Sequence, residues 1–256
     1  MAFEKDREDL IEGRNAVIEA LRAGRGIDKI YIAKGETDRT LGHIAAKARD
    51  AGVVVVLSDR RKLDAMSANP AKAHQGVIAV AAVKEYCSID DILAVAAEKG
   101  EAPFVIVCDA LSDPHNLGAV LRAAECVGAH GVVIPKRRSA GVTGIVEKTS
   151  AGAAEHVPVA RVPNLSAALR ELKDRGLWVY GAAAGAEKSL WETDFTGPLA
   201  LVIGSEGDGM GRLVQEQCDF LVSIPLRGKL DSLNAATAAG VLMYEVLRQR
   251  TTETHG

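Results

Sequence analysis

The sequence has few of the residues that hold metals or form disulfides. Its 256 residues include only four cysteines, with no CxxC pair, and six histidines without HxxxH spacing. Cys108 and Cys126 lie in apolar strand or helix patterns, where a free thiol behaves as a small hydrophobic side chain. We therefore expect neither a disulfide nor a bound metal.

The sequence also lacks a long apolar run and a strongly basic balance. No uninterrupted apolar stretch approaches the roughly 18 residues of a membrane span. The opening residues MAFEKDREDLIEGR are too charged for a signal peptide, so we expect a cytoplasmic protein without membrane association. The net charge of -3 argues against binding through a strongly basic surface. Residues 1–84 carry fifteen Lys/Arg against twelve Asp/Glu, or +3, and the remainder has sixteen against twenty-two, or -6.

The first 84 residues have the pattern of a small α/β domain. Apolar alternation and β-branched runs predict strands at residues 27–33, 53–57 and 75–83. Helical spacing predicts helices at residues 15–23, 39–51 and 60–68. The run VVVVL at residues 53–57 is typical of a strand buried on both faces.

Residues 85–102 are predicted to form a linker that contains a helix. Ser88 and Asp91 form a capping-box pattern, and Gly100 is a stop signal. Beyond residue 103, strands and helices alternate, which indicates a parallel sheet with helices on both sides. The predicted strands are 104–108, 131–134, 177–180, 199–203 and 220–224, and the predicted helices are 117–127, 144–150, 165–175, 212–217 and 234–250. We therefore expect a small domain at 1–84, a linker at 85–102 and a larger domain at 103–256.

The stretch DALSDPHNLGAVLRAAE follows the predicted strand 104–108 and carries the first candidate site residues. Asn116 is a favoured N-cap residue, and the long side chain of Arg122 is able to fold back towards the start of the helix. That arrangement would place an amide and a guanidinium at the carboxyl end of a strand, where open α/β sheets bind ligands. Taken alone, the same residues also describe an ordinary capped helix with one solvated arginine.

Two more loops follow predicted strands. GSEGDG at residues 204–209 has three glycines, which permit close approach of a ligand to the backbone. It is neither a dinucleotide fingerprint, since Arg212 stands where the third glycine belongs, nor a phosphate-binding loop ending in Lys-Ser/Thr. IPLRGKLDSLN at residues 224–234 brings Ser232 and Asn234 to the start of the last helix. Each loop alone is also explained by a turn or a helix cap.

Together, the sequences NLGAVLR, IGSEGDG and IPLRGKLDSLNAATAAG resemble the three signature motifs of the SpoU (TrmH-like) branch of the SPOUT methyltransferases. That family methylates ribose 2′-hydroxyls of RNA with S-adenosylmethionine. The resemblance extends over about residues 104–250 and includes KTSAGAAEHVPV at residues 148–159. GRNAVIEAL at 13–21 and HQGVIAV at 74–80 are similar to the small substrate-binding domain that precedes the catalytic domain in ribosomal members.

The resemblance implies a fold that general rules do not predict. Those rules favour an unknotted, doubly wound sheet. The family instead has a C-terminal parallel-sheet α/β domain with a trefoil knot, here preceded by a small α/β substrate-binding domain, and works as a homodimer. The similarity is greatest to members that methylate a guanosine of 23S ribosomal RNA, with tRNA or another ribosomal RNA site as the alternative substrate.

The resemblance also implies roles for individual residues. It implies S-adenosylmethionine contacts for Gly204, Ile224 and Leu233, no metal, and catalytic or positioning roles for Asn116, Arg122, Glu206, Ser232 and Asn234. Arg122 is usually cast as the base in this family, but a guanidinium keeps its proton, with a pKa above about 12. We therefore expect Arg122 to stabilise the developing alkoxide, while Glu206, a phosphate or water accepts the proton.

Other interpretations remain open at this stage. Lys136-Arg137-Arg138 and Arg60-Arg61-Lys62 are candidate phosphate-binding runs, although a solvated charge run is the commoner explanation for each. The glycine loops are also compatible with a nucleotide-dependent oxidoreductase, which the missing third glycine argues against and a nicotinamide titration would test. A non-catalytic RNA-binding or ribosome-assembly factor on the same fold is a third interpretation. Its motifs would be free to erode, whereas all the motif positions here are filled.

Overall fold

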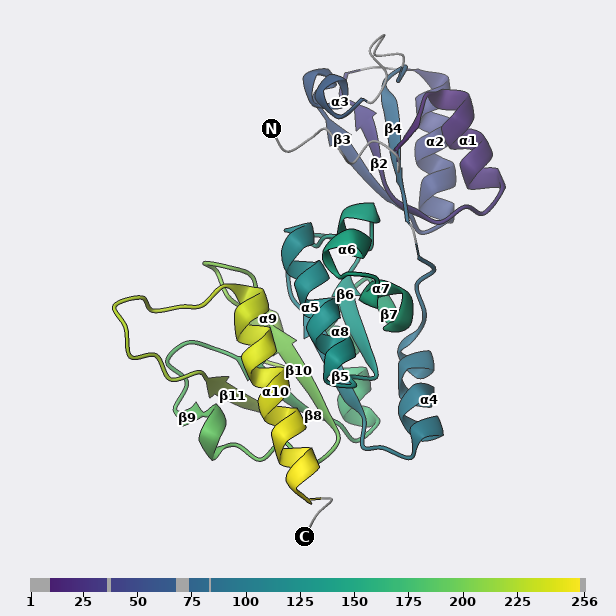
Figure 1. Cartoon of the computed structure of the whole chain (residues 1–256). Helices are drawn as coiled ribbons and strands as arrows, with labels where there is room; N and C mark the ends of the chain where they lie inside the picture. Colours follow the sequence, from purple (N-terminus) through teal and green to yellow (C-terminus); the bar gives the residue numbers. More distant parts are fainter. Residues whose placement is uncertain (1–9, 36–37, 68–73, 83, 254–256) are drawn as a thin grey trace. The chain divides into compact units, whose positions relative to one another are not determined.

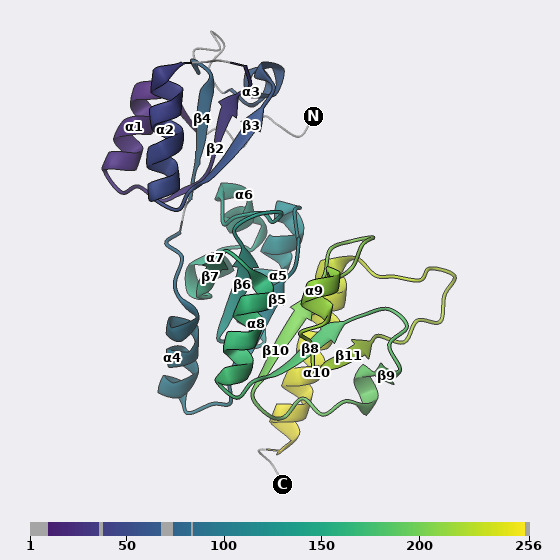
Figure 2. The same ribbon diagram turned by 180° about the vertical axis from the view of Figure 1, so that it is seen from behind.

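The chain folds into two compact units. The computed structural model describes residues 10–35, 38–67, 74–82 and 84–253. One unit comprises Met1–Glu85 with Gly141–Ile145, and the other comprises Tyr86–Ala140 with Val146–Gly256 (Figures 1 and 2). Among the described residues, no helix combines the length and apolar character needed to span a membrane.

The first unit contains a four-stranded sheet in the order β1-β4-β2-β3. Strands β2 and β3 are parallel, whereas β4 runs antiparallel to both β1 and β2. Apolar residues of α1 and α2 cover one face of the sheet, and Leu63 of α3 packs on the other. The elements are β1 (Leu10–Glu12), α1 (Arg14–Arg22), β2 (Ile27–Ala33), α2 (Arg39–Asp50), β3 (Val54–Ser58), α3 (Arg60–Met66) and β4 (Val77–Ala81).

The structure corrects one expectation for this unit. The VVVVL run was expected to form a strand buried on both faces, but β3 lies at the edge of the sheet and its valines are only half-buried. Leu57 is 62% exposed. A β-branched run reports strand preference, and burial depends on the strand order, which the run does not encode. The predicted ends of a helix at residue 68 and of a strand at residue 83 lie outside the described residues.

The second unit contains a seven-stranded sheet in the order β7-β6-β5-β10-β8-β11-β9. Every neighbouring pair of these strands is parallel, which confirms the predicted parallel sheet. Strands β5 and β10 have the predicted bounds. The strands are β5 (Phe104–Cys108), β6 (Gly131–Pro135), β7 (Val159–Val162), β8 (Trp178–Ala182), β9 (Lys188–Ser189), β10 (Leu199–Ile203) and β11 (Phe220–Ser223).

Helices cover both faces of the large sheet, as Figures 1 and 2 show from opposite sides. Helices α4, α8 and α9 pack on one face, in a core that includes Val105, Val179 and Val202. Helices α5 and α10 contact each other on the opposite face. The helices of this part of the chain are α4 (Ile89–Lys99), α5 (Pro114–Cys126), α6 (Gly144–Thr149), α7 (Ala153–His156), α8 (Leu165–Asp174), η1 (Leu190–Glu192), α9 (Arg212–Gln215) and α10 (Ala235–Glu253).

Helix α4 occupies most of the predicted linker and is part of the second unit. The predicted capping box is present, because Ser88 and Asp91 bond each other's backbone N–H groups, and Gly100 ends the helix in the left-handed conformation. Ile89 and Ile92 are buried in the core of this unit. A Cβ on Gly131 would lie 2.6 Å from the Ile92 side chain, so α4 packs directly on β6.

The start of α5 differs from the prediction. Asp113, rather than Asn116, caps the helix by accepting a hydrogen bond from the backbone N–H of His115, and Pro114 occupies the first turn. Proline suits this position because its missing N–H has no partner there and its φ is already helical. Asn116 therefore lies inside the first turn, with its side chain free to bond other elements.

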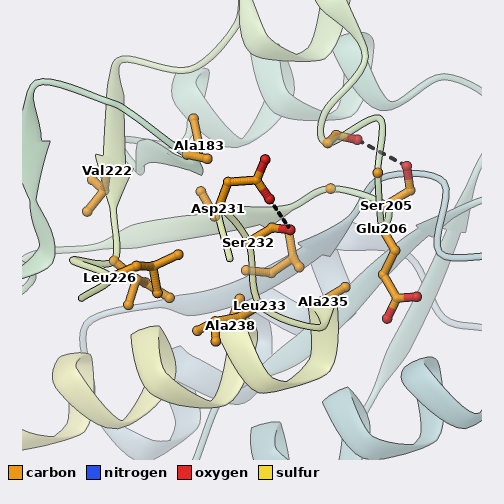
Figure 3. Close-up of a pocket in the computed structure, with 17 residues that line it drawn as sticks. Ala183, Ser205, Glu206, Val222, Leu226, Asp231, Ser232, Leu233, Ala235 and Ala238 are labelled. Atoms are coloured by element: carbon orange, nitrogen blue, oxygen red, sulfur yellow. Dashed lines mark hydrogen bonds between the residues drawn. The ribbon is translucent and has the colours of Figure 1, made fainter. Parts of the chain in front are cut away.

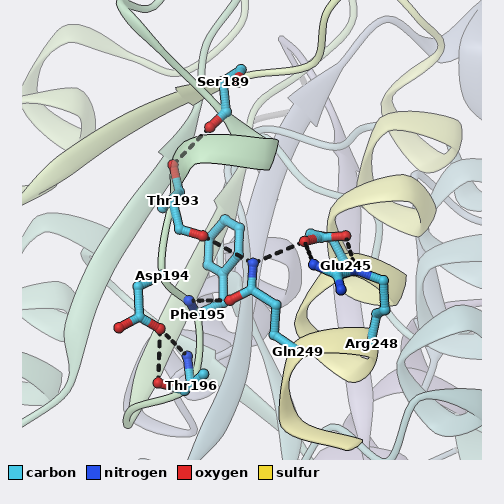
Figure 4. A network of polar contacts seen from close by, with 8 residues as sticks. All are labelled: Ser189, Thr193, Asp194, Phe195, Thr196, Glu245, Arg248 and Gln249. Carbon is cyan, nitrogen blue, oxygen red and sulfur yellow. Dashed lines mark hydrogen bonds and ion pairs between the residues drawn. The ribbon is translucent and has the colours of Figure 1, made fainter. Parts of the chain in front are cut away.

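The C-terminal helix is fastened to the connection between β9 and β10 (Figure 4). Gln249 donates to the carbonyl of Thr193 at 2.9 Å and accepts from the backbone N–H of Phe195 at 2.8 Å. Gln249 also donates to the buried carboxylate of Glu245, which accepts two further bonds from Arg248. The Arg248 hydrogen bonds hold the pKa of Glu245 below its ordinary value. This network ties the second half of α10 to the segment that leads into β10.

Candidate active site

A cavity lies at the carboxyl edge of the large sheet, beside the pair β5 and β10. These two strands are neighbours in the sheet, although β6 to β9 lie between them in the sequence, so the strand order changes direction at this pair. Open α/β sheets bind ligands at such a position. The cavity has a volume of about 430 Å³ (Figure 3). Its walls come from the loops that follow β8, β10 and β11 and from the first turns of α10. The lining residues are Ala182, Ala183, Ala184, Ile203, Gly204, Ser205, Glu206, Gly207, Gly209, Val222, Ile224, Leu226, Asp231, Ser232, Leu233, Ala235 and Ala238.

The glycine loop after β10 folds back on itself. The backbone N–H of Ser205 donates to the carbonyl of Gly209 at 3.0 Å, and the N–H of Gly209 donates to the carbonyl of Ser205 at 3.1 Å. Gly207 and Gly209 have φ of 85° and 65°, a conformation that favours glycine. A Cβ on Gly204 would lie 2.3 Å from the backbone carbon of Gly209. The close return of the chain therefore requires glycine at position 204.

Three polar side chains from three separate parts of the chain meet at the rim of this cavity: one from the first turn of α5, one from the loop after β10 and one from the start of α10. The amide of Asn116 donates to Oε1 of Glu206 at 3.0 Å. The amide of Asn234 donates to the same oxygen and to Oδ1 of Asn116, the latter at 3.0 Å. The strands therefore bring together residues that stand 118 positions apart in the chain.

The orientation of the Asn234 amide follows from its role as a helix cap. Its Oδ1 accepts hydrogen bonds from the backbone N–H groups of Ala236 and Thr237, at 3.0 and 3.1 Å. Its NH₂ group must then face Glu206 and Asn116, because an amide has its acceptor and its donors on opposite sides. The Asn116 oxygen accepts from Asn234, so the Asn116 NH₂ group is also directed at Glu206. Both amides thus hold one carboxylate oxygen in place.

Asp109 ties two of these loops together, a contact that the sequence reasoning missed. Its Oδ2 accepts from the backbone N–H of Gly211 at 2.7 Å, and its own N–H donates to the carbonyl of Ile203 at 2.8 Å. Asp109 follows β5 directly, whereas Gly211 lies just beyond the glycine loop. The available signal was an acidic residue at the end of a predicted buried strand, but its partner could not be read from the sequence.

The structure gathers seven of the eight predicted site residues. The five that line the cavity are Gly204, Glu206, Ile224, Ser232 and Leu233, and the two that bond Glu206 at its rim are Asn116 and Asn234. Figure 3 shows Ser232 facing Asp231, to which it donates at 3.2 Å. Arg122 is the exception. It is exposed, it does not line the cavity, and no hydrogen bond or ion pair joins it to the described residues.

The position of Arg122 has a simple geometric cause. It lies six residues beyond Asn116, which corresponds to about 9 Å of helix rise. The inward face of α5 buries Leu117, Val120 and Leu121, whereas Arg122 is on its exposed face. The predicted contact between the Asn116 amide and the Arg122 guanidinium is therefore absent.

The structure adds lining residues that were not among the predicted site residues. Ala182 ends β8, Ala183 and Ala184 follow it, and Leu226 and Asp231 belong to the loop after β11. Alanines carry no chemical signal, and only the spatial order β10-β8-β11 brings them to this cavity. A run of small residues after a predicted strand was the one available indication.

Two cysteines near the site remain thiols. Burial, assisted by the charge of Asp109, raises the pKa of Cys108 to about 12. Burial also raises the pKa of Cys218 to about 12. Because the thiolate is the nucleophilic form, neither cysteine is suited to covalent catalysis. Among the described residues, no cluster of three or more His, Cys, Asp or Glu side chains is able to hold a metal ion.

The fold and the cavity define an α/β protein with a ligand site at the carboxyl edge of a parallel sheet. Residues 103–244 match the family model of the SpoU rRNA methylase family, and residues 10–87 match the model for RNA 2′-O ribose methyltransferase substrate binding. The chain belongs to the SpoU methylase family and has the SPOUT type of fold. It is an S-adenosylmethionine-dependent RNA methyltransferase.

Individual relatives agree with this assignment. The chain is 49% identical to the "Putative TrmH family tRNA/rRNA methyltransferase YacO" of Bacillus subtilis, over 95% of this chain and 97% of that protein. It is 45% identical to a relative of the same family in Staphylococcus aureus, over 95% of this chain and 97% of the relative.

Solved structures show the same fold. The structure is similar to the SpoU methyltransferase AviRb of Streptomyces viridochromogenes in complex with AdoMet, with a TM-score of 0.61 and 24% identity over 95% of this chain and 90% of that one. It is also similar to an RNA 2′-O ribose methyltransferase, with a TM-score of 0.54 and 27% identity over 94% of this chain and 88% of that one.

The cavity fits S-adenosylmethionine by size and by chemistry. A volume of about 430 Å³ lies within the range of roughly 300–1,000 Å³ for small-molecule sites. Val222, Ile224 and Leu226 give it an apolar wall for a planar base. Glu206 and Asp231 are its charged residues, and no Lys, Arg or His occurs among the described residues that line it. Carboxylates without competing cations suit a ligand that carries a sulfonium and an ammonium.

Proposed function

We propose that this enzyme methylates a ribose 2′-hydroxyl of RNA, with a guanosine of 23S ribosomal RNA as its target. The observation that carries this proposal is the Glu206 carboxylate, which Asn116 and Asn234 hold at the rim of the cavity. The match of residues 10–87 to a 2′-O ribose methyltransferase substrate-binding model supports the ribose as acceptor. The relatives act in name on tRNA or rRNA, so tRNA is the second candidate substrate.

Glu206 has the geometry of a proton acceptor. Both amides bond to Oε1, so they fix the carboxylate without occupying Oε2. A catalytic base must lie within hydrogen-bond reach of the proton that it removes. In this proposal a ribose hydroxyl donates to Oε2 of Glu206.

The chemistry requires an oxygen nucleophile in line with the methyl group. S-adenosylmethionine, when bound, supplies an electrophilic methyl on a positively charged sulfur. Gly204, Ile224 and Leu233 would hold the cofactor, and Glu206 would accept the hydroxyl proton as the ribose oxygen takes the methyl group that the cofactor releases from its sulfur. Holding both partners in fixed positions accounts for much of the rate enhancement in reactions of this kind.

Arg122 is proposed to act through its charge. A guanidinium does not release its proton at neutral pH, so it is unsuited to be the base. Because Arg122 lies outside the cavity on the exposed face of α5, its cation is suited to bind a phosphate next to the target ribose. We assign Ser232 a role in positioning the ligand, because it lines the cavity and bonds Asp231.

The domain organisation in this proposal follows the family models. Residues 1–84 form the RNA substrate-binding domain, 85–102 the linker, and 103–256 the catalytic domain, supported by the matches at 10–87 and 103–244. The trefoil knot, the homodimer, the role in rRNA processing and the cytoplasmic location remain predictions of the family resemblance.

Mapping of 2′-O-methyl marks tests the proposal directly. Ribosomal RNA and tRNA from cells with and without this protein are compared by reverse transcription at low nucleotide concentration, which stops at methylated riboses. We expect one guanosine in 23S RNA to lose its mark in the deletion strain and to regain it with the purified enzyme. A mark lost from tRNA supports the alternative substrate, and a mark on a base rather than a ribose refutes the proposed chemistry.

A further inference from the structure

Two basic segments lie at the same edge of the large sheet as the cavity. Arg137 and Arg138 follow β6, and Arg227 and Lys229 follow β11. All four side chains are exposed. Because β6 and β11 belong to one parallel sheet, the loops that follow them emerge at its carboxyl edge. Four strand spacings of about 4.8 Å separate the two strands, or roughly 19 Å.

The first basic segment is anchored beside the loop that begins α5. The backbone N–H of Ala140 donates to the carbonyl of Leu111 at 2.7 Å, and the buried hydroxyl of Ser139 donates to the same carbonyl at 3.3 Å. Arg138 has a φ of 58°, which a non-glycine residue rarely adopts unless the surrounding structure imposes it. These contacts hold both arginines outward next to the segment that carries Asn116.

The second basic segment borders the cavity itself. Leu226 and Asp231 both line the cavity, so the residues between them span its margin. Arg227 and Lys229 lie in this span, and neither forms a hydrogen bond or ion pair with the described residues. Both cations are therefore available at the cavity margin to a ligand that is larger than the cavity.

The centre of the edge is negative. Glu206 follows β10, so it lies between the two basic segments, and Asp231 lines the cavity next to the second one. A phosphate is repelled from these carboxylates and attracted to the flanking cations. A polyanionic chain laid along the edge therefore places phosphates at its two sides and an uncharged group over Glu206. The repeat of RNA, with a ribose between successive phosphates, has this alternation.

We infer that a single strand of RNA binds along the carboxyl edge of the seven-stranded sheet, with phosphates on Arg137 and Arg138 at one side and on Arg227 and Lys229 at the other. This track sets the target ribose over Glu206. The inference rests on the proposed function, and it adds the residues that position the substrate.

The test measures binding of a fluorescent single-stranded RNA of mixed sequence at several salt concentrations. Three full-length variants are compared with the wild-type enzyme: Arg137→Gln/Arg138→Asn, Arg227→Gln/Lys229→Gln, and the control Lys99→Gln/Arg170→Gln on α4 and α8. Asparagine is chosen at position 138 because it tolerates a positive φ. S-adenosylmethionine affinity and the melting temperature show whether each variant keeps its fold.

Each track variant is expected to lower the slope of log affinity against log salt by about 1.4, since a single strand contributes about 0.7 for each phosphate. Its KM for RNA rises, its S-adenosylmethionine affinity stays at the wild-type value, and the control keeps the wild-type slope. Unchanged slopes in both folded track variants overturn the inference. The same variants are also tested for binding to polyglutamate. If they lose binding to polyglutamate but keep binding to RNA, the inference is also overturned, because the basic surface would then fit an acidic protein.

Failure of the track and failure of the proposed function give different results. If the wild-type enzyme marks a base instead of a ribose, the proposed function is wrong, whereas the salt slopes still report the track. If the ribose is marked and the slopes do not change, only the track is wrong.

Discussion

Replacing Gly204 with alanine tests the claim that a backbone turn forms the cofactor site. The added Cβ would lie 2.3 Å from the backbone carbon of Gly209 and 2.4 Å from the nitrogen of Met210. Ordinary contact begins at 3.4 Å, so the two chain segments must separate by about 1.1 Å. The obstacle is backbone on both sides, which no side-chain rotation relieves.

The cost has two components. Overpacking of this kind destabilises a folded protein by about 1–3 kcal/mol. At roughly 2–4 °C for each kcal/mol in a chain of this size, the melting temperature falls by about 2–12 °C. The separation also moves the 204–209 loop, which forms one wall of the cavity. Because a displacement of about 1 Å can cost about a hundredfold in catalysis, we expect the larger loss in turnover.

Thermal unfolding and turnover assays measure the two components, and isothermal titration with S-adenosylmethionine reports whether the cavity wall has moved. The matched control is Gly197→Ala, because a Cβ on Gly197 meets no atom within 4 Å. We expect Gly204→Ala to lose at least about tenfold in cofactor affinity, equivalent to about 1.4 kcal/mol, while Gly197→Ala keeps the wild-type value. If Gly204→Ala binds the cofactor and melts as the wild type does, the glycine loop does not form the site as described.

Three further predictions concern charge and protonation. Glu206→Gln should reduce kcat by about 10²–10⁴, as expected for removal of a base, whereas the exposed control Glu98→Gln should turn over normally. Equal activity of both variants would refute the role of Glu206. Arg122→Lys should keep most of the wild-type turnover and the same dependence of turnover on pH, since a positive charge suffices. A changed dependence at high pH would show that the guanidinium takes part in proton transfer. His130 is 1% exposed and accepts from Phe104 N–H through Nδ1, and burial lowers its pKa below the ordinary 6.5 despite the opposing effect of Glu101. The unfolded chain then binds this proton more tightly than the folded protein does. The free energy of unfolding therefore has its full value above pH 6.5 and decreases as the pH falls towards the pKa of the folded protein. Denaturant titrations should show this decrease in the wild type and not in His130→Gln, and the same pH dependence of the free energy of unfolding in both proteins would contradict the assignment.

The alternation of strands and helices could be predicted from the sequence because each element depends on residues that are close together in the chain. Strand β5 and the capping box of α4 depend on residues within a few positions of each other, and both were predicted correctly. Strands β1, β7 and β9 were not predicted. Strands β1 and β9 have only three and two residues, and β7 is a four-residue strand between prolines. The cap of α5 was placed at Asn116 because asparagine is a favoured cap residue, although proline after an acidic cap also begins a helix.

The candidate site could be predicted only in part, because its residues come from distant parts of the chain. The three loops were found by their resemblance to family motifs, and their convergence depends on β10 lying between β5 and β8. No residue encodes that order locally. The contact of Asp109 with Gly211 and the position of the three alanines at the end of β8 are consequences of the same order, so they became visible only in the structure.

The position of Glu206 couples the chemistry of the site to the packing of two helices. Asn116 lies in the first turn of α5, Asn234 caps α10, and these helices pack against each other on one face of the sheet. A shift of either helix relative to the other changes the distance between the two amides, which share one carboxylate oxygen. Hydrogen bonds weaken steeply when their length or angle departs from the optimum. The position of the carboxylate therefore depends on the packing of α5 against α10, and a substitution buried between these two helices is expected to impair catalysis before it unfolds the protein.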